Sequence, residues 1–230
     1  MSSLETVAIV PVKALAEAKS RLAAVLTPLA RRRLVLAMLD DVLAALAATS
    51  LVTRTLVVTP DPSVADAARA RGAEIIRETG PSNLNAALRY ALHHGPCVTG
   101  TRCLILPADI PLVTPDEIAR LLQPEATGTG AASPRTVIAP SHDGGGTNAL
   151  VLTDHDLMGP SFGADSFRRH LELAEGLHLD PRVVRLPGLG FDIDTPADLR
   201  RLSQIERYHW LNEARANELR PVPPRAHQTA

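Results

Sequence analysis

Residues 54–78 read RTLVVTPDPSVADAARARGAEIIRE, and this stretch decides the fold class. It opens with an apolar run of strand length, Arg54–Pro60. The Asp-Pro pair that follows is a typical helix start, because an N-cap side chain and a proline at the first helical position both favour one. The helix predicted over 62–71 ends at Gly72, and a second strand is predicted over Ala73–Glu78. A strand, a helix and a strand in this order form a β-α-β unit, which pairs its strands in parallel.

The same alternation extends in both directions along the chain. Further strands are predicted at Val7–Val12, Arg102–Ala108, Val137–Ser141, Thr147–Leu152 and Val183–Pro187. Further helices are predicted at about 28–48, 83–94, 115–122, 165–175 and 196–207. At Thr114 the helix start includes Glu117 three residues later, which completes a capping box. The pattern predicts an α/β fold with three layers, a mostly parallel sheet with helices on both faces.

One domain accounts for most of the chain. The 230 residues are 45% hydrophobic and 21% charged, a composition typical of a folded globular protein with one substantial core. We assign residues 1–207 to a single domain, in which the small-residue stretch Ala126–Ser133 interrupts the regular alternation. Residues 208–230 end in a proline-rich segment and are predicted to form a disordered tail.

Several classes of protein are excluded by composition and motif. No apolar run approaches the roughly 18 residues of a membrane span, and Glu5 stands where a secretory signal is basic, so we expect a cytoplasmic protein without a membrane partner. A net charge of −1 and 3% aromatic residues argue against nucleic-acid binding. Cys97 and Cys103 lack the spacing of a zinc site and are expected to be small buried residues. The histidines and serines form no zinc or hydrolase motif.

A basic loop follows the first predicted strand. Of 24 basic residues only two are lysines, and both, Lys13 and Lys19, lie in this loop with Arg21. The loop lacks the glycine patterns of dinucleotide and P-loop sites, so its cationic side chains would have to bind a polyphosphate directly. The alternative is a solvated helix face on which Glu17 pairs with a lysine.

Acidic residues follow two other elements. Asp109 comes directly after the strand that ends at Ala108, at the edge where parallel sheets bind ligands, and could share Mg²⁺ with phosphate oxygens. Its alternative role is to cap a turn. Asp192 and Asp194 precede the last predicted helix, where acidic residues are also favourable without any function because Thr195 is the expected N-cap.

Three polar segments are candidates for binding the rest of a ligand. The turn Gly144–Gly146 allows close backbone approach, and Thr147 and Asn148 after it can donate hydrogen bonds to a carboxylate or phosphate, although a flexible hairpin explains the glycines equally well. Ser166 and the amides before it lie at a predicted helix N-terminus, a potential anion site. Asn85, in the first turn of another helix, either reads a base edge or caps that helix.

Five segments in this order resemble the CofC/FbiD guanylyltransferases across about residues 6–205. They are VPVK-x5-KSRL at 10–22, LPADIPL at 106–112, GGTNAL at 145–150, FGADSFRRH at 162–170 and DIDTPADL at 192–199. The resemblance implies a sheet of the nucleotide-diphospho-sugar transferase (GT-A-like) type. It also implies transfer of GMP from GTP to a phosphorylated three-carbon acid, with release of pyrophosphate, in coenzyme F-420 biosynthesis. The acceptors of this family include 2-phospho-L-lactate, phosphoenolpyruvate and 3-phospho-D-glycerate, and its members are often homodimers.

The resemblance also implies roles for individual residues. The residues that would bind the triphosphate and carry catalysis are Lys13, Lys19, Arg21 and Asp109, and Asn85 would contact the guanine. Mg²⁺ would be bound by Asp109 and Asp194, with Asp192 beside them. The acceptor would be bound by Thr147, Gly163 and Ser166, together with Asn148. An acceptor phosphate has its second pKa near 6, so it needs no general base, in keeping with the missing catalytic histidine. Two alternatives stay open: a nucleotidyltransferase acting on a sugar phosphate or molybdopterin, and a nucleotide-binding domain without catalysis.

Overall fold

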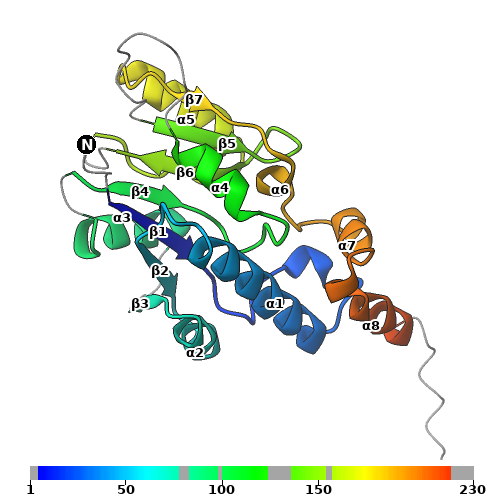
Figure 1. Cartoon of the computed structure of the whole chain (residues 1–230). Helices are drawn as coiled ribbons and strands as arrows, with labels where there is room; N and C mark the ends of the chain where they lie inside the picture. Colours follow the sequence, from blue (N-terminus) through cyan, green and yellow to red (C-terminus); the bar gives the residue numbers. More distant parts are fainter. Residues whose placement is uncertain (1–4, 78–82, 98–99, 124–135, 154–156, 219–230) are drawn as a thin grey trace, which may run out of the picture.

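The computed structural model describes residues 5–77, 83–97, 100–123, 136–153 and 157–218, with side chains to residue 214. The stretch Ala126–Ser133 and the last twelve residues of the expected tail, 219–230, lie outside the described residues. Seven strands form one sheet in the order β3-β2-β1-β4-β6-β5-β7 (Figure 1). Their bounds are β1 Thr6–Pro11, β2 Arg54–Thr59, β3 Glu74–Arg77, β4 Arg102–Ile105, β5 Thr136–Pro140, β6 Thr147–Leu152 and β7 Arg182–Val183. Six of the seven predicted strands are thus confirmed in place, with ends that differ from the prediction by at most three residues.

The sheet is mostly parallel, as predicted. β1 pairs in parallel with β2 and β4, β2 with β3, and β5 with β7. β6 runs antiparallel to both β4 and β5, and the glycine-rich turn joins β5 and β6 directly as a hairpin. The parallel strands β1 and β4 therefore present their carboxyl ends at one edge of the sheet.

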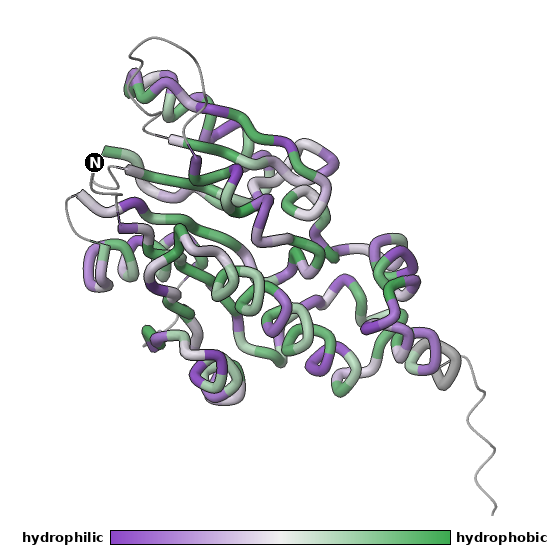
Figure 2. Tube along the Cα trace, in the orientation of Figure 1, coloured by the Kyte–Doolittle hydropathy of each residue, from purple (hydrophilic) through white to green (hydrophobic). Residues whose placement is uncertain are grey.

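Helices cover both faces of the sheet. Their bounds are α1 Pro28–Ala47, α2 Pro62–Ala70, α3 Leu84–His94, α4 Pro115–Leu122, α5 Ser166–Gly176, α6 Pro187–Gly190, α7 Pro196–Leu202 and α8 Trp210–Glu218. One hydrophobic cluster joins the sheet to α1, α2, α4 and α7, and a second joins its other face to α3 and α5 (Figures 1 and 2). Adjacent residues of β1 point into different clusters, because side chains alternate between the two faces of a strand. Ala8 and Val10 lie in the first cluster, and Val7 and Ile9 lie in the second. The three-layer prediction is confirmed.

Two elements after β5 differ from the sequence-based expectation: the helix predicted over 196–207 ends at Leu202, and the last predicted strand is replaced in part by a helix. The strand predicted over Val183–Pro187 is a two-residue edge strand, Arg182–Val183, and the four-residue helix α6 follows it. Pro187 explains the change, because proline at the first helical position favours a helix start and cannot donate to a strand ladder. Among the described residues, no helix is both long and apolar enough to cross a membrane.

The segment after residue 207 is not wholly a disordered tail. Tyr208 and Leu211 are fully buried against the first cluster, and α8 continues to Glu218. The Tyr208 hydroxyl donates to Asp41 of α1 at 2.5 Å, and Arg207 contacts the same carboxyl at 2.7 Å. Burial of the Tyr208 and Leu211 side chains anchors the segment, so residues 208–214 pack on the domain and do not belong to the predicted disordered tail.

This anchoring predicts a stability effect. Replacing Leu211 with alanine should lower the free energy of unfolding by about 2–4 kcal/mol, because it leaves a cavity under α8. Urea unfolding followed by circular dichroism measures the effect, with Glu213→Ala on the exposed side of the same helix as the control. Equal stability of the two variants would contradict the packing of α8 on the domain.

Candidate functional site

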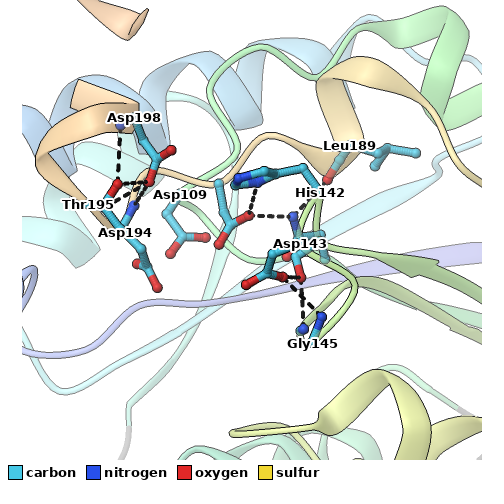
Figure 3. A network of polar contacts seen from close by, with 12 residues as sticks. Asp109, His142, Asp143, Gly145, Leu189, Asp194, Thr195 and Asp198 are labelled. Carbon is cyan, nitrogen blue, oxygen red and sulfur yellow. Dashed lines mark hydrogen bonds and ion pairs between the residues drawn. The ribbon is translucent and has the colours of Figure 1, made fainter. Parts of the chain in front are cut away.

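Two acidic segments meet beyond the carboxyl ends of β1 and β4. Asp109 lies in the turn after β4, and Asp194 lies just before α7. The backbone N–H of Ile193 donates to the carbonyl of Asp109 at 3.0 Å, which ties the two segments together. Figure 3 shows the Asp109 and Asp194 carboxylates near the start of α7. The structure thus brings together two residues that are far apart in the sequence.

Lys19 bridges these two carboxylates. Its Nζ lies 2.7 Å from an oxygen of Asp109 and 2.8 Å from an oxygen of Asp194, and its side chain is only 10% exposed. Burial alone would lower the pKa of Lys19, but the two carboxylates outweigh it and raise the pKa above its ordinary value. Lys19 is therefore a fully charged ammonium held between two anions.

The rest of the basic loop is more open. The segment folds as turns and a short 3-10 helix, Ser20–Leu22, and Lys19 precedes it in a left-handed conformation with φ 52°. Arg21 reaches Asp194 at 3.4 Å with a side chain that is 78% exposed, and Lys13 is exposed just beyond β1. The alternative of a helix face with Glu17 pairing a lysine is wrong for Lys19, which pairs with the two aspartates instead.

Asp192 lies beside this pair but has other partners. Its Oδ1 accepts from Asn148 Nδ2 at 3.1 Å and lies 3.5 Å from His142 Nδ1. Burial raises the pKa of Asp192, and the charges of Asp109 and Asp194 raise it further. Within the described residues no group of three His, Cys, Asp or Glu side chains is arranged to hold a metal ion, so a role for Asp192 as a third metal ligand stays a prediction. In the structure Asn148 and His142 contact the Asp192 carboxylate instead.

Asn148 also differs from its expected role. Its amide donates a second hydrogen bond to the Leu189 carbonyl at 2.9 Å, and the residue is 5% exposed. An asparagine amide has two hydrogens, and both are used here. The prediction that Asn148 donates to an acceptor ligand is therefore not supported; its amide joins β6 to α6 and to Asp192.

The glycine turn between β5 and β6 is held in place by side chains. Asp143 accepts from Ser141 Oγ at 2.5 Å and from the N–H of Gly145 at 3.0 Å. Figure 3 shows Asp143 beside Gly145. The Ser141 hydroxyl oxygen in turn accepts from the N–H of Gly146 at 2.7 Å. The Ser141 hydrogen bond and the Gly145 amide lower the pKa of Asp143. These bonds hold the turn in a defined conformation, which argues against the alternative of a freely flexible hairpin.

A second polar cluster lies on the other face of the sheet, around His170 of α5. Nδ1 of His170 lies 2.9 Å from the Thr147 hydroxyl, and the N–H of Ser161 donates to Nε2 at 2.8 Å. The Asn85 amide accepts from the N–H of Phe162 at 2.7 Å and donates to its carbonyl at 3.0 Å. Asn83, not Asn85, caps α3, accepting from Ala86 at 3.0 Å. Contact of Asn85 with a base stays a prediction, since its amide binds the 161–163 loop here.

The remaining expected acceptor residues border the same loop. Gly163 has φ +123°, a conformation that favours glycine, and a Cβ there would lie 3.5 Å from the Arg169 guanidinium. Ser166 begins α5 and is 1% exposed. Thr147, Gly163 and Ser166 therefore lie in or near one loop, whose backbone hydrogen-bonds to His170 and Asn85.

Sequence reasoning missed His142, His170 and Arg169 as parts of the site. A signal for His170 existed: Ser166, His170 and Ala174 are spaced four apart, and all three are buried on one face of α5. The hydrogen bonds of Arg169 to Ser161, at 3.1 Å from Nε and 3.0 Å from a terminal nitrogen, had no sequence signal because they depend on the path of the loop.

The partly buried charge of Asp192 predicts a stabilising substitution. Asp192→Asn should raise the free energy of unfolding at neutral pH by about 1 kcal/mol, because it removes a partly buried charge that Asp109 and Asp194 repel. The gain should vanish as the pH falls through the raised pKa of Asp192 towards the ordinary aspartate value, since the wild-type carboxyl is then neutral too. Thermal unfolding at several pH values measures this. A less stable variant at pH 7 would contradict the repulsion.

Comparison with known structures identifies the fold of the chain. A protein from Desulfovibrio desulfuricans G20 assigned to the nucleotide-diphospho-sugar transferases matches with a TM-score of 0.70 at 18% identity, covering 93% of this chain and 96% of its own. A nucleotidyl transferase from Methanothermobacter matches with a TM-score of 0.60 at 16% identity, covering 91% and 99%. At these identities the likeness shows the nucleotidyltransferase fold alone, in agreement with the expected sheet type.

Comparison of sequences gives the family. The family described as guanylyl transferase CofC like matches residues 6–205. A phosphoenolpyruvate guanylyltransferase of Sphaerobacter thermophilus is 43% identical over 202 residues, covering 87% of this chain and 93% of the relative. One of Rubrobacter xylanophilus is 45% identical over 199 residues, covering 85% and 92%. With its two aspartates, basic loop and glycine turn at one edge of a nucleotidyltransferase sheet, the chain belongs to the CofC-like guanylyl transferase family.

Proposed function

We propose that this protein transfers GMP from GTP to a phosphorylated three-carbon acid and releases pyrophosphate, as a step in coenzyme F-420 biosynthesis. The observation that carries the proposal is the ammonium of Lys19 held between Asp109 and Asp194 at the ligand-binding edge of the sheet. The names of the relatives, phosphoenolpyruvate guanylyltransferases, support GTP as donor and phosphoenolpyruvate as the first acceptor to test. 2-Phospho-L-lactate and 3-phospho-D-glycerate are the other candidate acceptors.

The reaction needs charge neutralisation more than proton transfer. An oxygen of the acceptor phosphate attacks the α-phosphorus of GTP, a new P–O bond forms, and the bond to pyrophosphate breaks. The acceptor phosphate is largely ionised at neutral pH, so no base has to remove a proton. The barrier lies in bringing two anions together, and fixed positive charge with in-line positioning lowers it.

The basic loop would supply that positive charge. Arg21 is exposed beside Asp194 and Lys13 is exposed after β1, so both side chains can extend to the β- and γ-phosphates of a nucleotide. Lys19 holds a charge at the centre and can exchange a carboxylate for a phosphate oxygen. Together these residues would bind the triphosphate and stabilise pyrophosphate as it leaves.

The acidic pair fits a divalent cation. Asp109 and Asp194 already converge on one cation, the Lys19 ammonium, which stands where an ion bridging them would bind. Mg²⁺ is usually held by one or two carboxylates with substrate phosphates, so two aspartates suffice without Asp192. Mg²⁺ held by this pair would neutralise charge on the α-phosphate and polarise it as a Lewis acid.

The acceptor would bind near the loop at 161–166. The Thr147 and Ser166 hydroxyls and the backbone at Gly163 are hydrogen-bonding groups of the kind that an acid and a phosphate require. This region borders the turn between β5 and β6, since the N–H of Phe167 donates to the Gly145 carbonyl at 3.4 Å. The turn is thus the element that connects the acceptor loop to the sheet edge.

A pyrophosphate-release assay tests the proposal. The purified chain is incubated with GTP, Mg²⁺ and each of the three acids in turn, and the same panel is repeated with ATP. Release that depends on one of the acids and is stronger with GTP supports the proposal. Product formed only from a sugar phosphate would indicate another nucleotidyltransferase, and GTP binding by calorimetry without release from any acceptor would indicate a non-catalytic domain.

A further inference from the structure

His170 is a buried side chain with a defined hydrogen-bond pattern. It is 0% exposed, it lies on α5 one turn after Ser166, and its two ring nitrogens face different groups. The N–H of Ser161 lies 2.8 Å from Nε2, and a backbone N–H can only donate. Nε2 must therefore be the unprotonated nitrogen of the ring.

This contact fixes the tautomer. In a neutral imidazole with a free lone pair on Nε2, the proton is on Nδ1, which lies 2.9 Å from the Thr147 hydroxyl oxygen. A second proton on Nε2 would oppose the Ser161 N–H, so the geometry disfavours the charged ring. Burial and the nearby Arg169 charge agree with this, lowering the pKa of His170 to about 4.

This tautomer determines where the Thr147 hydroxyl hydrogen points. Nδ1–H of His170 donates to the Thr147 oxygen and occupies one of its lone pairs. The hydroxyl hydrogen must then rotate away from the ring and is left to donate elsewhere. A threonine next to a ring with the opposite tautomer would point its hydrogen at Nδ1 and would present only lone pairs, which repel an anion.

We propose that His170 is a positioning residue, whose Nδ1–H orients the Thr147 hydroxyl so that it donates to the anionic group of the phosphorylated acid. The inference rests on the proposed function, because that function places the acceptor at Thr147. It gives His170 a role in acceptor recognition without contact to the substrate or to the reacting phosphorus.

Two substitutions at His170 separate this role from simple support of the loop. Asparagine retains a donor near the position of Nδ1 and loses the acceptor for Ser161. Glutamine reaches the position of Nε2 and can accept from Ser161, but has no donor towards Thr147. The proposal predicts that His170→Gln raises the KM for the acceptor by about tenfold to a hundredfold, the effect of losing a hydrogen bond to a charged group, and that His170→Asn raises it less.

The KM for GTP should be unchanged in both variants, and the exposed His209→Gln should leave both KM values unchanged. Thr147→Val removes the hydroxyl at constant shape and should match His170→Gln. Combining the two should add no further increase in the acceptor KM, because they disrupt the same interaction. An acceptor KM for His170→Gln that does not exceed that of His170→Asn, or full additivity with Thr147→Val, would overturn the proposal.

A spectroscopic measurement tests the tautomer of His170 even if one of the two variants fails to fold. ¹⁵N–¹H correlation spectra of the wild-type imidazoles, assigned by the signal missing in His170→Gln or His170→Asn, should show a protonated Nδ1 and an unprotonated Nε2 at pH 7. A protonated Nε2 would overturn the proposal. If the wild-type chain transfers GMP to no acceptor, the proposed function fails; if it transfers GMP but the order of the two variants is reversed, only the role of His170 fails.

Discussion

Replacing Asp109 with asparagine is expected to lower turnover by at least about a hundredfold, the effect of losing a key electrostatic group at a reacting phosphate. The substitution preserves shape and removes one of the two carboxylates that converge on Lys19 at 2.7 and 2.8 Å. A neutral amide binds a divalent cation far less strongly than a carboxylate. The loss should therefore appear mainly in the rate of guanylyl transfer.

Pyrophosphate release at saturating GTP and acceptor measures this change. Asp194→Asn should behave similarly, because Asp194 is the other half of the pair. Asp116→Asn, which removes the same charge from an exposed position in the first turn of α4, should leave turnover unchanged. Near-normal turnover of Asp109→Asn would reject the assignment of a metal to this pair.

Replacing Lys19 with methionine should have two opposite effects. Turnover should fall by about a hundredfold, because the variant loses a positive charge that would meet the phosphates. The affinity of the nucleotide-free protein for Mn²⁺ should rise by about tenfold, because a divalent ion no longer competes with an ammonium that is 10% exposed between the two carboxylates. Few substitutions that reduce activity are expected to strengthen metal binding, so the pair of effects is diagnostic.

Electron paramagnetic resonance of free Mn²⁺ measures the affinity without any turnover. Lys13→Met is the matched control, since Lys13 is an exposed lysine of the same loop. It should weaken GTP binding and leave the Mn²⁺ affinity of the nucleotide-free protein unchanged. Weaker Mn²⁺ binding in Lys19→Met would mean that Lys19 does not occupy the position of the metal.

The elements of the fold were predictable where a local signal defines them. Thr27, Asp61, Thr114 and Thr195 each cap a helix that begins with proline, and each cap accepts a hydrogen bond from the backbone of its own first turn. The alternation of Ala8 and Ile9 between two cores likewise follows from the period of a strand. The segment from Tyr208 was misjudged because its burial comes from α1, which lies far away in the sequence.

The site was predictable in its members but not in its pairings. The strand end at Asp109 and the cap at Thr195 placed two acidic segments at the sheet edge. That Lys19 would join them depends on contacts across 90 and 175 residues, which no local pattern encodes. The same limit applies to Asn85, whose amide binds a loop 77 residues away, and to Asn148, whose two hydrogens are used inside the protein.

In the proposed function a divalent ion replaces the Lys19 ammonium between Asp109 and Asp194. This replacement is most directly tested by a crystal structure with Mn²⁺ and a GTP analogue that resists cleavage. Anomalous scattering locates the ion independently of any assumption about the site. We predict a peak between the two carboxylates, with Nζ of Lys19 moved onto phosphate oxygens. An ion bound elsewhere, with Lys19 still joining both aspartates, would contradict the account.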